Sequence, residues 1–437
     1  MKSETILIIA HAHPKFSKGG GEIAAYNMYK ELLRQGYDAY FLAAHSNEKA
    51  HHGYTPFSIV SEREILLYST RMDYFFNTLY DKRGAWKYFD ELLNKIEPDV
   101  IHFHHYMHLG LENIRVAHNY KVDNPEKNVR IFLTIHEYIA ICAHNGQMVK
   151  KDSGALCYKS DYIDCSQCFP ERNPTDFYLR EKYIQSFFGL VDHFISPSHF
   201  LIERYVAWGI SPERITMLEN GQVYSPEIKR EKRALRDDEK RSIFGYFGQI
   251  NPFKGIDVLL ESLEYLDKDT LKEFRLHVHG TGMELWPEEF QKKIAKLLRK
   301  YRKNVTFYGK YEVEELPDLM GEVDWVIIPS TWWENSPLVI QESFKFGKPM
   351  IASDIGGMAE KVTDGKDGLH FKARNPRDLA KQISRAIREP ELYDELYERI
   401  TMPISIEESV KEHLEIYRKG DFENKEEKSV YSSCGHA

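Results

Sequence analysis

The sequence has no excess of positive charge. Its 437 residues carry 59 Lys and Arg against 67 Asp and Glu, which gives a formal charge of −8. A negative balance provides no general attraction for a polyanion and argues against a nucleic-acid partner. An anionic ligand would have to be held by a local cluster of side chains. The charge pattern therefore favours a small-molecule pocket over a basic binding face.

Long hydrophobic runs are also lacking. No apolar stretch approaches the roughly 18 residues that a membrane-spanning helix needs. The run at residues 5–10 is too short for the hydrophobic region of a signal peptide, and it reads as a buried first strand. We therefore expect a cytoplasmic protein, with peripheral contact at the inner face of the membrane as an open alternative. Aromatic and basic residues at 71–95 could face a lipid-linked acceptor, although helical packing explains them more simply.

Cysteine is scarce: five occur in the chain, and four of them fall within 27 residues. This is not the dense framework of a small secreted domain. Four thiolates in a polar, loop-like segment could form a structural zinc site that orders an insertion at about residues 140–175. Free thiols are the alternative, because the first two spacings differ from those of a standard zinc ribbon. The four candidate ligands are Cys142, Cys157, Cys165 and Cys168.

A dinucleotide-binding fingerprint is missing as well. The Gly-rich segment FSKGGGE follows the first predicted strand, but it lacks Gly-x-Gly-x-x-Gly. The second strand, AYFLAAH, has no acidic residue at its end to bind the ribose of NAD. A dehydrogenase is therefore disfavoured. Gly20 and Gly21 still mark a loop whose amides could face a ligand, with a simple tight turn as the alternative.

Short apolar runs rich in Ile, Val and Phe do recur, separated by amphipathic stretches. This rhythm is typical of parallel strands alternating with helices. It occurs twice, and a chain of this length suits two cores better than one. We predict two doubly wound α/β domains facing each other across a cleft, because such sheets bind ligands at the carboxyl ends of their strands. The predicted strands are residues 5–10, 39–45, 99–105, 129–136, 193–198 and 215–220, then 242–248, 274–280, 305–309, 324–330, 348–354 and 368–371.

The mixed-sign stretch between the two sets lacks aromatic residues and reads as a solvated linker. We predict an N-terminal acceptor domain at residues 1–225 and a linker at 226–240. A C-terminal donor domain is expected at 241–410. Residues 411–437 are expected to form a final helix end and a frayed tail.

Two carboxylates stand in the most informative segment, DWVIIPSTWWENSPLVIQESFKFGKP. Glu334 lies in the loop after a predicted strand, and Glu342 lies on the second turn of the helix that follows. Asn335 or Ser336 is expected to cap this helix, with Pro337 in its first turn and Gly347 just past its end. Each carboxylate could accept hydrogen bonds from vicinal sugar hydroxyls, while the helix N-terminus favours phosphate. By spacing alone, a solvated Glu334 and a salt-bridged Glu342 are the simpler explanation of the pair.

The segment ENSPLVIQE, followed by GKPMIASDIGGMAEKV and DGLHF, resembles the donor-site signature of the retaining GT-B glycosyltransferases of family 4. Further segments resemble landmarks of that family in the family's usual order along nearly the whole chain. These segments are GGGEIAAYNMYKELLRQGYD, EPDVIHFHH, LTIHEY, VDHFISPSHF, ITMLENG and FGQINPFKGIDVLLESL.

The resemblance implies a role for each matching residue. Glu334 would hold hydroxyls of the donor sugar, and Glu342 those of the ribose. Lys254 would neutralise the diphosphate, and Gly20 and Gly21 would lie near the phosphates and the acceptor. His136, at the end of a strand, would face the transferred sugar. A surface lysine and a structural histidine are the respective alternatives for Lys254 and His136.

Two positions depart from the family pattern. Gln249 stands where the family usually has Arg or Lys, which lowers the positive charge at the phosphates. Pro337 stands where the family often has Gly, and Pro has no N–H to donate. The amides of Leu338 and Val339, together with Asn335 and Ser336, then become the expected donor contacts. His102, His104 and His105 end another strand and are further candidates to line the cleft.

The activity implied by the resemblance is retaining transfer of a sugar from a nucleoside diphosphate sugar to a hydroxyl. The acceptor would be a glycan, a lipid-linked molecule or a small molecule. No metal or other cofactor is expected in catalysis, and no side chain is placed as a nucleophile. The alternatives on the same fold are a nucleotide-sugar epimerase, a phosphorylase, and a non-catalytic sugar-nucleotide-binding protein.

Overall fold

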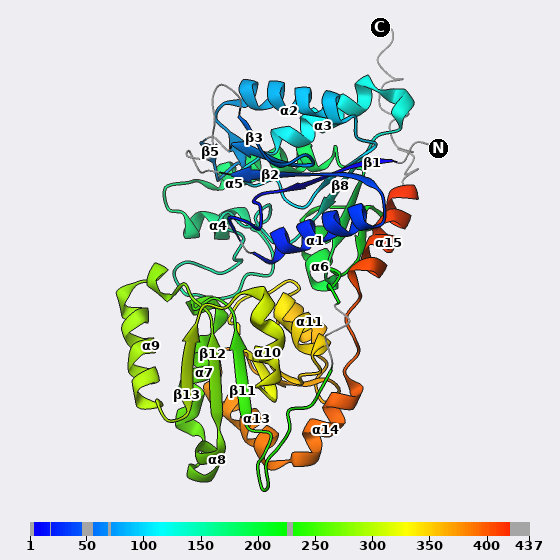
Figure 1. Cartoon of the computed structure of the whole chain (residues 1–437). Coiled ribbons are helices and arrows are strands. Elements are labelled where there is room, and N and C mark those ends of the chain that lie inside the picture. Colours follow the sequence, from blue (N-terminus) through cyan, green and yellow to red (C-terminus); the bar gives the residue numbers. More distant parts are fainter. Residues whose placement is uncertain (1–3, 18, 46–55, 69–70, 225–229, 420–437) are drawn as a thin grey trace.

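Two sheets of parallel strands, each covered by helices, form the body of the molecule (Figure 1). The computed structural model describes residues 4–17, 19–45, 56–68, 71–224 and 230–419. Within these residues the predicted α/β fold is confirmed: all twelve predicted strands are present, and every one pairs in parallel with its neighbours.

The N-terminal sheet has eight strands in the order β10-β9-β8-β7-β1-β2-β4-β3. The chain order reverses between β1 and β7, so the loops after these two strands diverge and leave a crevice at the carboxyl edge. The strands are β1 (Thr5–Ala10), β2 (Asp38–His45), β3 (Phe57–Ser61), β4 (Glu64–Tyr68), β7 (Val100–Phe103), β8 (Arg130–Thr134), β9 (His193–Ser196) and β10 (Ile215–Met217).

The C-terminal sheet has six strands in the order β13-β12-β11-β14-β15-β16, with the reversal between β11 and β14. Its central strands are buried on both faces, which explains why they read as continuous apolar runs. The strands are β11 (Ile243–Phe247), β12 (Arg275–His279), β13 (Val305–Gly309), β14 (Trp325–Ile328), β15 (Met350–Ser353) and β16 (Gly368–Phe371).

Helices cover both faces of each sheet (Figure 1). Those packed around the N-terminal sheet are α1 (Gly20–Arg34), α2 (Lys82–Ile96), α3 (Glu112–Asp123), α4 (Tyr162–Cys168), α5 (Pro174–Phe188) and α6 (His199–Trp208). Those of the C-terminal part are α7 (Ile256–Ser262), α8 (Lys268–Glu273), α9 (Glu288–Lys300), α10 (Leu316–Gly321), α11 (Leu338–Lys345), α12 (Gly356–Lys361), α13 (Pro376–Arg388), α14 (Pro390–Arg399) and α15 (Ile406–Arg418).

The last helix crosses back to the first sheet. Figure 1 shows α15, in red, beside α1 instead of beside the sheet that precedes it in the chain. Val410, Leu414 and Tyr417 of α15 are buried in the same cluster as β1, β2 and α1. The two halves are therefore joined twice, once before β11 and once before α15.

The sequence did not predict the antiparallel β3–β4 hairpin at the sheet edge, nor the short pair β5 (Met72–Asp73) and β6 (Thr78–Leu79). Part of the predicted linker is also less solvated than expected. Arg233 is paired with Asp324, which has no exposed surface, at 2.9 Å. Residues 226–229 of that linker and residues 420–437 of the predicted tail lie outside the described residues.

Candidate functional site

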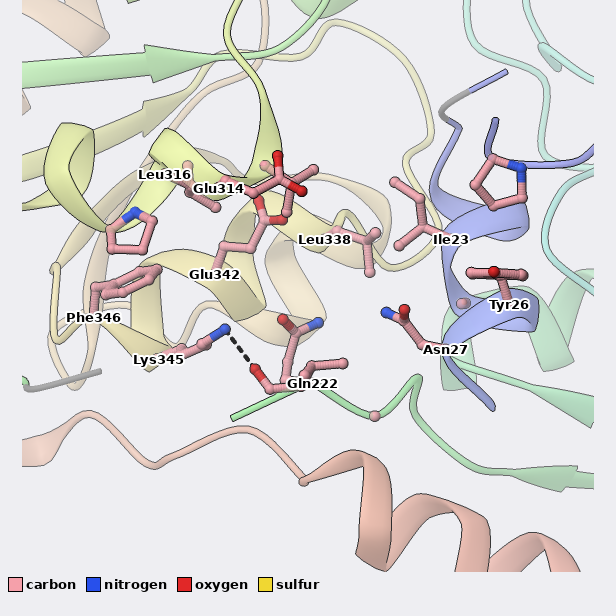
Figure 2. A pocket seen from close by; sticks show the side chains of 16 residues that line it. Ile23, Tyr26, Asn27, Gln222, Glu314, Leu316, Leu338, Glu342, Lys345 and Phe346 are labelled. Carbon is pink, nitrogen blue, oxygen red and sulfur yellow. Dashed lines mark hydrogen bonds between the residues drawn. The ribbon is translucent and has the colours of Figure 1, made fainter. Parts of the chain in front are cut away.

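A cavity of about 530 Å³ lies between the two halves at the carboxyl edges of their sheets. α1 contributes Ile23, Tyr26 and Asn27 from one side, and α11 contributes Leu338 and Glu342 from the other. Figure 2 shows Leu338 and Ile23 facing each other across this cavity, with Lys345 donating to the carbonyl of Val223 at 2.7 Å. The cavity therefore has walls from both sheets, as the sequence predicted for a ligand cleft.

Glu342 projects into this cavity from the second turn of α11 (Figure 2). Burial raises the pKa of its carboxyl to about 7, although nearby Lys345 opposes the shift. Near neutral pH this group is therefore part carboxylate and part acid, unlike an ordinary surface glutamate. A ligand that donates hydrogen bonds would favour the ionised form.

Glu334 lies outside the cavity lining, in the loop between β14 and α11, and is 7% exposed. Three donors converge on its Oε1: Lys254 Nζ at 2.7 Å, Ser330 Oγ at 2.8 Å and Trp332 Nε1 at 2.9 Å. Burial opposes ionisation, but Lys254 and the other two donors hold the pKa of the carboxyl below its ordinary value. Among the described residues no hydrogen bond reaches Oε2, so this oxygen can accept hydrogen bonds from a ligand.

Lys254 lies in the loop after β11, and Glu334 lies in the loop after β14. The strand order of the sheet reverses between these two strands, at its switch point, and the side chain of Lys254 contacts Glu334 across it. Asn251 accepts hydrogen bonds from the backbone N–H groups of Phe253 and Lys254, at 3.0 and 2.9 Å, and so fixes the single turn that presents the ammonium group. Gln249, two residues before Asn251, is exposed, and its carbonyl accepts a hydrogen bond from Tyr246. The structure thus brings Lys254 and Glu334 together and leaves Gln249 at the surface.

The predicted capping of α11 is wrong. Pro337 occupies the N-cap position, and no side chain caps this helix. Asn335 instead donates to the carbonyl of His136 at 3.1 Å and accepts from Ser198, and Ser336 donates to Glu219 at 3.3 Å. These side chains bind the N-terminal half, which is why they cannot fold back onto the helix. Gly347 does follow the end of α11 in the left-handed conformation, as predicted.

Gly20 and Gly21 are the first residues of α1 and not part of a loop. A Cβ on Gly20 would lie 3.6 Å from Leu338, at the start of α11, and one on Gly21 would lie 3.5 Å from the ring of His136. The N-termini of α1 and α11 therefore converge on one place, and both carry partial positive charge there. A larger residue at either glycine would fill this space.

His136 follows β8 and lies beneath Gly21. His104 Nδ1 lies 3.1 Å from His136 Nε2, and the two rings stack at 5.4 Å. Burial lowers the pKa of His136 to about 4, so its ring is neutral at pH 7. A neutral imidazole can orient a hydroxyl but carries no charge to stabilise a phosphate.

The three histidines of the β7 segment have different positions. His102 has no exposed surface and binds Tyr417 and Thr134, so its predicted place in the cleft wall is wrong: it is a core residue. His104 is buried behind His136. His105 accepts hydrogen bonds from two backbone amides through Nδ1, while Nε2 lies 3.5 Å from Glu137.

Ser330 and Trp332 are contacts of Glu334 that sequence reasoning missed. Both stand within four residues of Glu334. A hydroxyl and an indole N–H so close to a carboxylate in sequence could have been predicted as its hydrogen-bond donors. Trp333, the next residue, was missed as well. It belongs to the C-terminal half yet is buried in the core of the N-terminal half.

All four clustered cysteines line a second cavity of about 450 Å³ in the insertion. They are free thiols, and burial raises the pKa of the Cys157 thiol to about 11. In the part of the chain that the structure describes, no group of three or more His, Cys, Asp or Glu is arranged to hold a metal ion. The predicted zinc site is therefore not formed by these four side chains as they stand.

Two family models match the chain in sequence. Residues 18–222 match the model described as Glycosyltransferase Family 4, and residues 227–401 match Glycosyl transferases group 1. The chain belongs to the family 4, or group 1, glycosyltransferases. The two matched stretches correspond to the two sheets, and the second contains Lys254, Glu334 and Glu342.

Curated relatives of this family-4 chain match it over part of their length. An uncharacterized glycosyltransferase of Methanocaldococcus jannaschii is 30% identical over 34% of this chain and 39% of its own. A D-inositol 3-phosphate glycosyltransferase of Corynebacterium efficiens is 26% identical over 44% of this chain and 46% of its own. The chain thus spans less than half the length of these relatives.

Solved structures match the fold of this family-4 chain over nearly its whole length. The HepE protein of Anabaena, in complex with UDP and glucose, has a TM-score of 0.64 at 15% identity and covers 95% of this chain and 100% of its own. A sucrose-phosphate synthase from Thermosynechococcus elongatus has a TM-score of 0.67 at 17% identity, covering 95% and 98%. The two facing sheets form the GT-B fold, as the sequence predicted. Among the described helices, none is long and apolar enough to cross a membrane.

Proposed function

We propose that this chain is a retaining glycosyltransferase that moves a sugar from a nucleoside diphosphate sugar to a hydroxyl of a glycan, a lipid-linked molecule or a small molecule. The observation that carries the proposal is the pairing of Lys254 with Glu334 beside the N-terminus of α11, at the switch point of the C-terminal sheet. A cation, a hydrogen-bond acceptor and a helix N-terminus then surround one position in the cleft.

In the proposed complex, Glu334 holds hydroxyls of the donor sugar through Oε2, because Oε1 already accepts three hydrogen bonds. A site built to receive a hydroxyl discriminates strongly against a ligand that lacks it, since the buried acceptor would be left unpaired. Ser330 and Trp332 fix the orientation of this carboxylate. Lys254 keeps it ionised and can turn toward the diphosphate.

The diphosphate is proposed to lie between the starts of α1 and α11. Gly20 leaves room in front of Leu338, and the backbone amides of Leu338 and Val339 are the expected phosphate contacts. Lys254 adds the positive charge that Gln249 does not supply. Glu342, inside the 530 Å³ cavity, is proposed to bind the ribose hydroxyls, and the rest of that cavity to receive the base.

The proposed transfer breaks the bond between the anomeric carbon and the diphosphate oxygen and forms a bond from that carbon to the acceptor oxygen. The new bond forms on the face that the diphosphate leaves, so the configuration is retained. The departing diphosphate takes the proton of the acceptor hydroxyl, and Lys254 stabilises the negative charge that develops on it. No side chain acts as a nucleophile, and the proposal assigns no step to a metal. His136 is proposed to orient a hydroxyl of the transferred sugar as a neutral imidazole.

The test begins with the donor. Thermal-shift measurements against a panel of nucleotide sugars should show a rise in melting temperature with one of them, because a ligand that binds the folded state stabilises it by mass action. Transfer is then measured with that donor for Glu334→Ala and Lys254→Ala. We expect each change to lower turnover at least a hundredfold while leaving the fold intact.

Lys300→Ala is the matched control. Lys300 pairs with Glu264 at 2.6 Å at the far end of α9, and its loss should leave turnover unchanged. Unchanged turnover in Glu334→Ala or Lys254→Ala would overturn the proposed function. Donor binding without transfer or hydrolysis, tried with glycan and lipid-linked acceptors, would instead identify a non-catalytic sugar-nucleotide-binding protein.

A further inference from the structure

Trp333 stands directly before Glu334, but its side chain belongs to the other half of the molecule. Its ring is 4% exposed and lies within the hydrophobic core of the N-terminal half. It packs against Tyr158 and Phe200, each with a ring-to-ring distance of 5.1 Å. Aromatic pairs at this separation contribute about 0.5–1.5 kcal/mol beyond their buried area. The loop that carries Glu334 is therefore anchored in a domain from which it does not come.

The indole N–H of Trp333 has a defined partner. It donates to the carbonyl of Cys157 at 2.8 Å. Cys157 is the last residue of a short hairpin, residues 148–157, closed by a bridge between Val149 and Leu156 and by the hydrogen bond from Cys157 N to Met148 O. The accepting carbonyl is thus held in a small, internally bonded unit.

A second contact joins the tip of the same hairpin to the same loop. Arg374, which follows β16, donates through Nη1 to the carbonyl of Gly154 at 2.6 Å and through Nε to the carbonyl of Thr331 at 3.0 Å. Arg374 has φ of 65°, a conformation that costs energy for a side chain larger than Gly and persists only where the surroundings impose it. One guanidinium therefore fixes the hairpin and the start of the loop to each other.

The residue after Glu334 is held from the same direction. Asn335 bonds to the carbonyl of His136 and to the hydroxyl of Ser198, both in the N-terminal half. Among the described residues, the side chain of Glu334 accepts hydrogen bonds from Lys254, Ser330 and Trp332, and its carbonyl accepts one from Gly357; all four belong to the C-terminal half. The side chains of the two flanking residues, Trp333 and Asn335, are thus held by the N-terminal half, while Glu334 itself is held by the C-terminal half.

We infer that Trp333 is a positioning residue for the donor site. Together with Cys157, Gly154 and Arg374 it forms an interdomain clasp that fixes the direction in which Glu334 presents Oε2. The hairpin at residues 148–157 then helps to position Glu334 in the donor site, although the hairpin lies in the N-terminal half. This inference rests on the proposed function, because it assigns the clasp to the sugar that Glu334 is proposed to hold.

The experiment compares Trp333→Phe with Trp208→Phe. Both remove a buried indole from the same core, but Trp208 ends α6 and packs against Phe188 and Tyr205 of the N-terminal half. Turnover and Michaelis constant are measured with the donor found by thermal shift. The affinity for the matching nucleoside diphosphate, which lacks the sugar, is measured by calorimetry.

For Trp333→Phe we expect turnover to fall about tenfold, because small displacements of a positioning group are costly, while nucleoside diphosphate affinity stays within twofold. For Trp208→Phe we expect a lower melting temperature with turnover within twofold of the unaltered chain. Turnover of Trp333→Phe within twofold of the unaltered chain would overturn the inference. So would a parallel fall of turnover and diphosphate affinity, since that indicates a general loss of structure.

Amide hydrogen exchange tests the clasp without using activity. In Trp333→Phe the amides at residues 331–336 and 150–157 should exchange faster than in the unaltered chain, while those of β11 and β12 should not change. Unaltered exchange in both segments would refute the clasp. If no nucleotide sugar binds or reacts, the proposed function fails by itself, and the exchange result still decides whether the two domains are clasped at this loop.

Discussion

Two effects act in opposite directions on the ionisation of Glu342: burial favours the protonated form, and the proposed ligand favours the carboxylate. Burial raises its pKa to about 7, above the ordinary value of 4.5. Its contribution to stability is therefore fully present below pH 4.5 and is lost as the pH rises through about 7, because the folded state must then hold a poorly solvated charge. Binding of ribose hydroxyls, in contrast, favours the ionised form.

We expect Glu342→Gln to raise the melting temperature relative to the unaltered chain at pH 8, with little difference at pH 4.5. Donor affinity at pH 8 should fall about tenfold to a hundredfold, since hydrogen bonds to a charged acceptor contribute about 1.5–3 kcal/mol. Thermal denaturation and calorimetry at the two pH values measure both effects. Glu289→Gln, at an exposed position of α9 outside the cavity lining, is the control. A stability difference that does not depend on pH would contradict this account.

Gly357 leaves no room for a side chain. A Cβ built on it would lie 1.5 Å from the backbone oxygen of Asn335, and its N–H donates to the carbonyl of Glu334 at 2.7 Å. Gly357→Ala must therefore push the loop of Glu334 away from α12. We expect a loss of about 1–3 kcal/mol of stability and a strong loss of turnover.

Gly321→Ala is the matched control for this substitution, because nothing lies within 4 Å of the position and its φ is not left-handed. It should leave turnover unchanged and stability equal or slightly higher, since Ala is the better helix former. Melting temperature and transfer rate measure both variants. Equal melting temperatures and equal transfer rates in the two variants would show that a side chain fits at Gly357 without displacing the loop of Glu334.

The helix α6 depends on the opposite domain for its first turn. Glu360 of α12 accepts hydrogen bonds from the backbone N–H groups of His199 and Phe200, at 3.0 and 2.8 Å. Ser198 caps the same turn and also donates to Asn335. A carboxylate at this end is favoured by the unpaired amides and by the helix dipole.

Glu360→Ala should lower the free energy of unfolding by about 1 kcal/mol, because two backbone donors lose their acceptor. For the same reason, amide hydrogen exchange in the first turn of α6 should become faster. Glu288→Ala is the control, since Glu288 forms an exposed pair with Lys292 that contributes little. Denaturant unfolding and hydrogen exchange measure the effect. Unchanged protection of α6 would show that water replaces Glu360 without loss.

Most helices and strands were predictable because their apolar periodicity is local. β1, β13 and β16 were predicted residue for residue, and the strands near them differ from prediction only at their ends. In the missed β3–β4 hairpin, β3 is the edge strand and has no fully buried residue, so its sequence lacks a continuous apolar run. β4 is short but mostly buried. The cap of α11 was mispredicted because Asn335 and Ser336 bind residues more than a hundred positions away.

The two halves of the molecule depend on α15 for their second connection. Tyr417 binds His102 at 2.6 Å, and its carbonyl accepts a hydrogen bond from Arg130. Val410 and Leu414 are buried against the N-terminal sheet. The final helix is therefore part of the N-terminal core.

A chain ending at residue 405 should lose several kcal/mol of stability in its N-terminal half, because each buried aliphatic or aromatic side chain contributes about 1.5–3 kcal/mol. A chain ending at residue 419 keeps α15 and all of these contacts, and it should denature like the full chain. Circular dichroism during thermal unfolding compares the two. Equal melting temperatures would show that α15 is dispensable for this core.

Periodicity and motif order are local properties of a chain, and they were enough to predict the two-domain α/β fold, the family, and the candidates Glu334, Glu342 and Lys254. The partners of these side chains, in contrast, became known from the folded structure. It placed Lys254 on Glu334, turned Asn335 toward His136, buried His102 in the core and inserted Trp333 into the opposite domain. These side chains contact residues 80 to 315 positions away, for Lys254 with Glu334 and for His102 with Tyr417. Such contacts depend on how two independently patterned sheets pack, which no local pattern contains.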